Sequence, residues 1–202
     1  MKMKKLIIKG LLLVLTSVSF QVFAKQEWIL NSEMSSVYFV SVKKSAVAET
    51  HTFKNISGVL TESGQAKVSI DLASVESMIP IRNERMKQHL FEVDKFPKAT
   101  ISAMVNADKI KRLKPGTSKQ QPLKLKLSLH GIESELEGEF SVTKLANNKI
   151  QVSTLKPVIV NAATFSLVDG INKLRELASL PSISTAVPVM VTLVYDGKSI
   201  AP

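Results

Sequence analysis

The sequence predicts an all-β domain, a barrel or a sandwich of about eight or more antiparallel strands with two short helices. Three observations lead to this prediction. Apolar and polar residues alternate in many short segments, as in strands with one buried face. Only two segments have helical spacing instead, and the chain shows no internal repeat, low-complexity tract or linker. The alternating segments are therefore expected to form a single domain.

The first 24 residues are predicted to be a cleaved signal peptide. Four lysines precede an apolar run over residues 10–23, which is shorter than the about 20 residues that a membrane span needs. Val22 and Ala24 are small residues at the positions that a signal peptidase prefers. The short signal indicates a bacterial protein, and the mature chain, residues 25–202, is then expected to be a soluble domain in the periplasm of a Gram-negative bacterium. Without cysteine, it can form no disulfide and carry no lipid-modified cysteine.

The positive charge of the mature chain is modest. The signal peptide removes four of the 27 Lys and Arg residues and none of the 17 Asp and Glu residues, so the net charge falls from +10 to +6. The basic residues are scattered rather than massed on one helix, which argues against nucleic-acid binding. Weak contact with an anionic membrane surface and an ordinary solvated surface both stay open.

Strands are expected wherever the alternation is clear. The expected segments are residues 37–42, 68–72, 101–105, 123–130, 135–142, 150–155, 157–162 and 186–195. Residues 123–130 have leucine at every second position with lysine, serine or histidine between, and residues 135–142 alternate glutamates with apolar residues. These two strands are predicted to form a hairpin in which Lys–Glu pairs contribute roughly 0.2–1 kcal/mol each. The last strand is apolar on both faces and is therefore central or covered.

The first helical segment is predicted over residues 81–90. Asn83 is the expected N-cap, because its side chain can accept a hydrogen bond from the first turn. Met86 and Leu90 then share one face, and Arg85 and His89 lie beside them at the same spacing of four residues.

The second helical segment is predicted over residues 171–180. Ile171, Leu174, Leu177 and Ala178 form its apolar stripe, and Pro181 ends it. A polar stretch over residues 116–122, which contains glycine and proline, is predicted to be a mobile loop between strands.

The sequence contains no arrangement typical of catalysis. His51, His89 and His130 lie far apart without metal-ligand spacing, and Glu92 and Asp108 are single carboxylates near expected turns. No nucleophile elbow or phosphate-binding loop is present. We therefore expect no enzyme activity, no catalytic residues, no metal site and no cofactor.

Four blocks of the chain resemble, in order, those of the YceI-like family of lipocalin-like periplasmic proteins. The blocks are SSVYFVSVKK, HTFKNISGVL, IRNERMKQHLFEVDKFPKATI and LKLKLSLHGIESELEGEF. The third is the most specific, with Arg85, His89–Leu90, Phe91, Phe96–Pro97 and Thr100–Ile101 similar to the family pattern, and the turn His130–Gly131 resembles the family's HGV-type turn with Ile132 in place of valine. The resemblance implies an antiparallel eight-stranded lipocalin-like barrel whose apolar interior binds a polyisoprenoid or a similar lipid.

The chain departs from the family pattern near its end. Many members have a short DFGI-type turn where this chain has FSLVDGINKLRELASLPSIS, residues 165–184, which is about one helix longer. An additional helix around Leu174 would either cap or fill a lipid pocket, and the sequence does not decide between these outcomes.

Two functions follow from the sequence. The first is a periplasmic carrier of a polyisoprenoid, an isoprenoid quinone or a fatty-acyl chain. Its apolar wall is predicted to include Phe39, Phe53, Ile101, Ala103, Leu125, Leu127, Leu129 and Phe140, and its polar mouth Arg85 and His89. The second is an enzyme or inhibitor that acts on a polar substrate and uses a side-chain-filled barrel as a scaffold. An exposed strand edge would also permit a homodimer.

Overall fold

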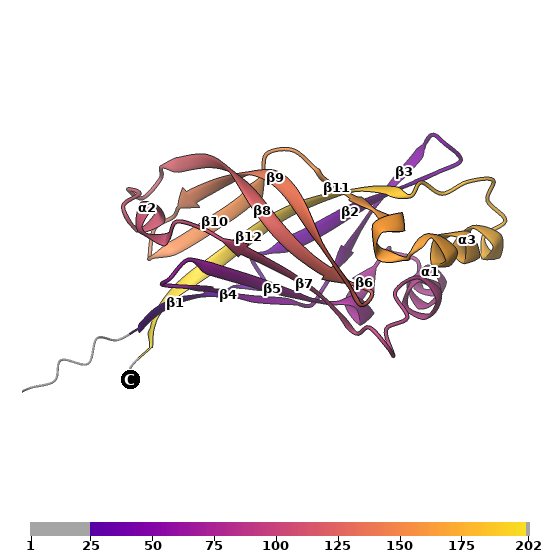
Figure 1. Ribbon diagram of the computed structural model, residues 1–202, viewed down its shortest axis with the longest axis horizontal. Helices are drawn as coiled ribbons and strands as arrows, with labels where there is room; N and C mark the ends of the chain where they lie inside the picture. The colour runs from indigo at the N-terminus through magenta and orange to yellow at the C-terminus, as the bar shows by residue number, and fades with distance from the viewer. Residues whose placement is uncertain (1–24, 201–202) are drawn as a thin grey trace, which may run out of the picture.

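The computed structural model describes residues 25–200, and the expected signal peptide lies outside the described residues. Twelve strand segments form one antiparallel sheet (Figure 1). They are β1(Lys25–Leu30), β2(Ser36–Lys43), β3(Val47–Phe53), β4(Ile56–Thr61), β5(Gln65–Asp71), β6(Val75–Glu76), β7(Lys98–Met104), β8(Ser118–Leu129), β9(Ile132–Lys144), β10(Lys149–Thr154), β11(Val158–Asn161) and β12(Ala186–Ile200).

The sheet closes on itself, because β12, which pairs with β10, also pairs with β1, the first strand of the order. One edge of β12 pairs with β1 and β2, and the other edge pairs with β10 and β11. β3 pairs with β2 and β4 pairs with β1, so β3 and β4 share the next position around the barrel. β6 pairs with β3 and β5 pairs with β4, so β5 and β6 share the position after that. The twelve segments therefore occupy eight positions around an antiparallel barrel, which confirms the predicted barrel and excludes the sandwich.

The hairpin of β8 and β9 forms as its alternation predicts. Lys124 lies opposite Glu137, and their charged groups are 3.8 Å apart on the exposed face. Lys126 instead reaches Glu133 along the diagonal, at 3.1 Å. The turn between the strands places His130 and Gly131 at φ values of 53° and 76°, as a two-residue type I′ turn requires.

The loop predicted over residues 116–122 is wrong for most of its length. β8 begins at Ser118, and its first residues pair with β9, with Ser118 opposite Thr143 and Pro122 opposite Glu139. The long partner strand supplies backbone hydrogen bonds that override the polar, proline-containing composition.

The segments β1, β3 and β4 were not among the expected strands, because each is short and its apolar residues alternate poorly.

The first predicted helix consists of α1(Pro80–Arg85) and a π-helical turn, η2(Met86–Leu90). Asn83 does not cap this helix, because Ile79 is at the N-cap and Asn83 lies within α1. The Asn83 side chain instead accepts hydrogen bonds from the N–H and hydroxyl of Ser77, at 2.9 and 2.6 Å, and donates to Glu76 at 2.9 Å. It therefore attaches the helix to the chain that precedes it.

The second predicted helix is α3(Val168–Leu177). Ile171 is buried and Leu174 packs against the core, but Leu177 and Ala178 are exposed because the helix ends there. A third helix, α2(Ala107–Lys111), was not predicted, since it is only five residues long. The structure also contains the 3₁₀ turns η1(Leu72–Ser74) and η3(Ala162–Phe165).

The helices lie at opposite ends of the barrel. α1 and α3 lie together at one end, beyond β6 and η3, which we call the helical end. α2 lies at the opposite end, where β1 starts (Figure 1). α3 packs closely on η2, because a Cβ on Gly170 would be 2.5 Å from the carbonyl oxygen of His89. This contact brings α3 to the end of the barrel.

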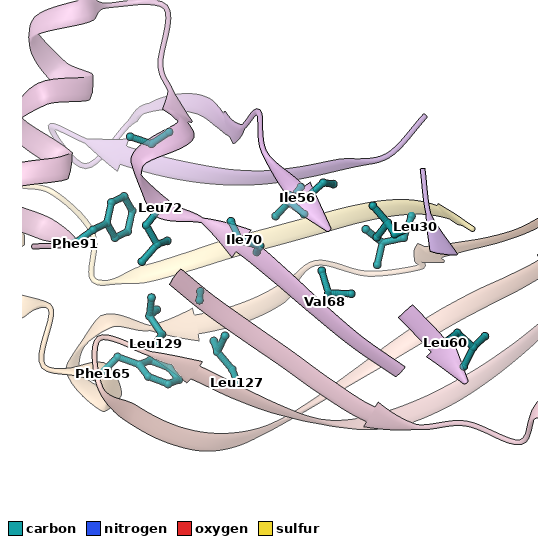
Figure 2. Packing of buried hydrophobic residues seen from close by; sticks show 14 of the residues in the cluster. Leu30, Ile56, Leu60, Val68, Ile70, Leu72, Phe91, Leu127, Leu129 and Phe165 are labelled. Carbon is teal, nitrogen blue, oxygen red and sulfur yellow. The ribbon is translucent and has the colours of Figure 1, made fainter. Parts of the chain in front are cut away.

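The core is formed by side chains that converge inside the barrel from distant parts of the chain. Figure 2 shows Leu60, Val68 and Ile70 from β4 and β5 pointing into the same space as Leu127 and Leu129 from β8. Aliphatic residues predominate, and each removes apolar surface from water at about 25 cal/mol per Å².

Candidate functional site

The interior of the barrel contains an apolar cavity of about 240 Å³. Its wall comes from all the long strands, from the helical end and from α2 at the other end. The lining residues are Val37, Phe39, Phe53, Leu60, Ala66, Val68, Ile70, Leu72, Leu90, Phe91, Ala99, Ile101, Ala103, Val105, Ile110, Leu123, Leu125, Leu127, Leu129, Leu136, Phe140, Val142, Val152, Thr154, Val158, Val160, Ala162, Leu167, Ile171, Val187, Val189, Val191, Leu193 and Tyr195. The space therefore extends along the barrel.

All eight residues that the sequence predicts as an apolar wall line this cavity. They are Phe39, Phe53, Ile101, Ala103, Leu125, Leu127, Leu129 and Phe140. The pairing of β7 with β8 places Ile101 beside Leu127 and Ala103 beside Leu125, so the inward faces of adjacent strands form a continuous apolar surface. Their role in binding a ligand stays a prediction.

Two residues with hydroxyl groups interrupt the apolar wall. The Thr154 hydroxyl accepts a hydrogen bond from the Val191 N–H at 3.2 Å, so it is already engaged with the backbone. Burial raises the pKa of the Tyr195 hydroxyl above its ordinary value, so this group stays neutral at physiological pH. The cavity wall contains no charged side chain among the described residues, and it therefore suits an aliphatic ligand.

The predicted polar mouth does not line the cavity. Arg85 donates from Nη1 to the carbonyl oxygen of Leu177, at 3.1 Å, which satisfies a group at the C-terminal end of α3. His89 lies half-buried on η2, and its neighbours Leu90 and Phe91 reach the cavity instead. The structure thus places Arg85 where it helps to hold α3, and leaves the predicted ligand contacts of both residues without geometric support.

A polar cluster that sequence reasoning missed lies on the inner face of β2 and β3. Beyond Phe39, this face continues to Lys43 on β2 and to His51 and Glu49 on β3. Glu49 accepts from Lys43 at 2.9 Å, and its two oxygens lie 3.2 and 3.3 Å from the guanidinium of Arg82 on α1. The hydrogen bond from Lys43 is the main cause of a lowered pKa of Glu49.

His51 is the most buried member of this polar cluster, with 4% of its surface exposed. Its ring stacks edge-on against Phe39, with centroids 5.2 Å apart, and its Nδ1 has no hydrogen-bond partner among the described residues. Burial, followed by the charge of Arg82, lowers the pKa of His51, so the imidazole is neutral. No sequence pattern indicated this site, because β3 was not expected as a strand and α1 is distant in sequence.

Other site types are not found in the described part of the chain. Within residues 25–200, no three His, Asp or Glu side chains gather in a way that could hold a metal ion. No helix in that range has the length and apolar character needed to cross a membrane.

The fold and the cavity define a class of protein, an antiparallel eight-stranded barrel with an apolar interior. The model of the YceI-like domain matches residues 28–195, which is most of the chain. The chain therefore belongs to the YceI-like family, as its sequence blocks predict.

Solved structures agree with this assignment. A polyisoprenoid binding domain from Saccharophagus degradans, implicated in plant cell wall breakdown, is 37% identical, with a TM-score of 0.83 over 85% of this chain and 98% of that chain. BcnA from Burkholderia cenocepacia is 17% identical, with a TM-score of 0.64 over 82% of this chain and 98% of that one. A YceI protein from Campylobacter jejuni is 16% identical, with a TM-score of 0.53 over 95% and 99%. A comparison with curated proteins finds no match.

The family assignment also bears on catalysis. The Saccharophagus degradans relative is named as a binding domain, and none of the names of these relatives indicates an enzyme. The relatives therefore give no support to the alternative of an enzyme.

Proposed function

We propose that the protein is a periplasmic carrier that holds the aliphatic chain of an amphiphilic lipid, such as a polyisoprenoid, inside its barrel. The observation that carries this proposal is the cavity of about 240 Å³ with its almost wholly apolar wall. The name of the Saccharophagus degradans domain, which binds polyisoprenoid and is 37% identical, supports the same ligand class. The alternative, a scaffold with a side-chain-filled core, accounts less well for an apolar cavity within the barrel.

The energetics of such binding are favourable. Each buried methylene contributes about 0.8 kcal/mol, so a chain of about a dozen carbons contributes roughly 10 kcal/mol before the costs of ordering. Micromolar affinity needs about 8 kcal/mol, so the apolar wall alone supplies most of the binding free energy. The polar end of the ligand then determines selectivity rather than strength.

An exposed apolar segment supports contact with a membrane surface during loading. Met78 is 87% exposed, and Ile79 and Ile81 are also exposed just before and within α1. Arg85 follows on the same short helix. Apolar side chains beside cations favour a bilayer that contains anionic lipids.

The outer edge of β3 supports a homodimer. β6 pairs only with Thr52 and Phe53, so the described residues leave the edge from Val47 to His51 without a strand partner on that side. Addition of a second copy at this edge would continue the sheet.

The carrier proposal is tested by extraction of the purified protein. The protein is expressed with its signal peptide, isolated from the periplasmic fraction and extracted with organic solvent, and the extract is analysed by mass spectrometry. We expect an isoprenoid or acyl lipid in near-stoichiometric amount and a mature chain that begins at Lys25. Clean extracts from repeated preparations, together with failure of the delipidated protein to take up farnesol or farnesene, would refute the proposal.

A further inference from the structure

We propose that the polar cluster of Lys43, Glu49, His51 and Arg82 is the head-group site of this barrel, and that His51 binds an uncharged oxygen of the lipid. The ligand class is a prenyl or acyl chain that ends in a hydroxyl or a carbonyl group. This inference rests on the carrier function proposed above, and it adds where the polar end lies and which charge it carries.

The polar cluster lies behind two residues of the cavity wall, although none of its own members lines the cavity. Phe39 and Phe53 line the cavity, and their ring centroids are 5.4 Å apart. His51 lies opposite Phe39 in the β2–β3 ladder and two residues before Phe53 on the same face of β3. A chain that leaves the cavity between these two phenylalanines therefore meets His51 first.

An unpartnered nitrogen gives His51 a reason to bind a ligand. A buried polar atom without a hydrogen bond destabilises the folded protein. Nδ1 of His51 is such an atom, although Lys43, Glu49 and Arg82 next to it satisfy one another. A hydroxyl or carbonyl oxygen placed at Nδ1 removes this cost, whereas a pure hydrocarbon does not.

The charges around His51 favour an uncharged head group over a phosphate. Glu49 already pairs with both Lys43 and Arg82, so an anion that approached these cations would also meet a carboxylate. His51 itself stays neutral, because burial and the nearby Arg82 lower its pKa. A neutral imidazole can donate to a carbonyl or accept from a hydroxyl, which are the interactions that alcohols and carbonyl compounds need.

The test compares three lipids with the same farnesyl chain. Farnesol, farnesyl phosphate and farnesene compete in equal amounts for the delipidated protein, and the bound fractions are read by native mass spectrometry. One hydrogen bond predicts that farnesol is preferred over farnesene by about three- to tenfold. Farnesyl phosphate is expected to bind less well than farnesol.

His51→Phe keeps a ring against Phe39 but removes the nitrogen. We expect this variant to lose the preference for farnesol, to keep its affinity for farnesene, and to unfold at the same or a higher temperature without lipid. His51→Gln, which restores a hydrogen-bonding group, should recover part of the preference, and it also serves if His51→Phe does not fold. A structural role of His51 would instead lower the unfolding temperature and weaken both lipids equally.

Other outcomes would overturn the inference. They are an unchanged farnesol preference in His51→Phe, a stronger binding of farnesyl phosphate in the wild type, or loss of the preference in His89→Phe in place of His51→Phe. The carrier function survives all three, because farnesene binding reports on the cavity alone. Failure of the wild type to bind any of the three lipids would overturn the carrier function as well.

Discussion

Enlargement of the leucine row of β8 tests whether the cavity is open space in the folded protein. Leu127 is 7% exposed and lines the cavity, as does its neighbour Leu125. In a filled core, Leu127→Phe would cost about 1–3 kcal/mol through overpacking, and Leu127→Ala about 2–5 kcal/mol. A cavity of about 240 Å³ instead accepts the larger ring. The ring then gains roughly one methylene equivalent of buried surface, about 0.8 kcal/mol.

The assay is denaturant unfolding of the delipidated protein, combined with lipid binding by native mass spectrometry. We expect at least one of Leu125→Phe, Leu127→Phe and Leu129→Phe to keep or gain stability and to lose lipid binding. Leu129 is the last residue of β8, next to the turn of the hairpin, so it is the member of the row that we expect to tolerate a ring least. Lys124→Phe, on the exposed face of the same strand, is the control, and it should leave lipid binding unchanged.

The reasoning is refuted if all three inward variants lose more than about 1 kcal/mol without ligand. The row would then face a filled core, and the carrier hypothesis would lose its main physical support.

Three further predictions concern the helical end of the barrel. Arg85→Met, which removes the hydrogen bond to the Leu177 carbonyl, should lower the unfolding temperature and weaken farnesol and farnesene equally, whereas selective loss of farnesol would restore Arg85 as a mouth residue. Hydrogen bonds to Glu76, of which the one from Lys54 has the largest effect, lower its pKa to about 2. This carboxylate therefore stabilises the fold above its ordinary pKa of 4.5 and ceases to do so as the pH falls towards 2. Glu76→Gln should therefore flatten the decline of the unfolding temperature over that range, and an unchanged profile would contradict it. Ile81→Asp should reduce cosedimentation with vesicles that contain phosphatidylglycerol while leaving farnesene binding intact, and equal cosedimentation of variant and wild type would argue against membrane contact through α1.

The sequence predicted best where side-chain periodicity and burial agree. The β8–β9 hairpin was predicted with the correct faces, because its leucines alternate without interruption and the turn at His130–Gly131 has the residues that a tight turn needs. Alternation of this kind placed seven of the eight predicted wall residues in expected strands that line the cavity, whereas Phe53 lies on β3, which was not an expected strand. Periodicity alone did not distinguish a barrel from a sandwich, since this difference depends on the pairing of β12 with β1.

The missed features depend on contacts between distant parts of the chain. Asn83 has a sequence context suitable for an N-cap, but Ser77 and Glu76 bind its side chain in the folded protein. Arg85 and His89 looked like a mouth because they flank an apolar helix face, yet Arg85 is directed to the end of α3. The His51 site forms only when the β2–β3 ladder and α1 come together, and no short segment of the sequence contains that information.

The longer segment near the end of the chain covers the helical end of the barrel. α3 caps this end rather than filling the barrel: Ile171 is its residue in the cavity wall, and Gly170 holds it against the His89 carbonyl. The polar cluster lies at the same end, because Arg82 belongs to α1, which lies beside α3 (Figure 1). A head group at His51 would then lie at the capped end, and the aliphatic chain would extend towards α2. Substitutions at Gly170 and His51 would act on the same end of the ligand, so we expect their free energies of binding to be coupled rather than additive.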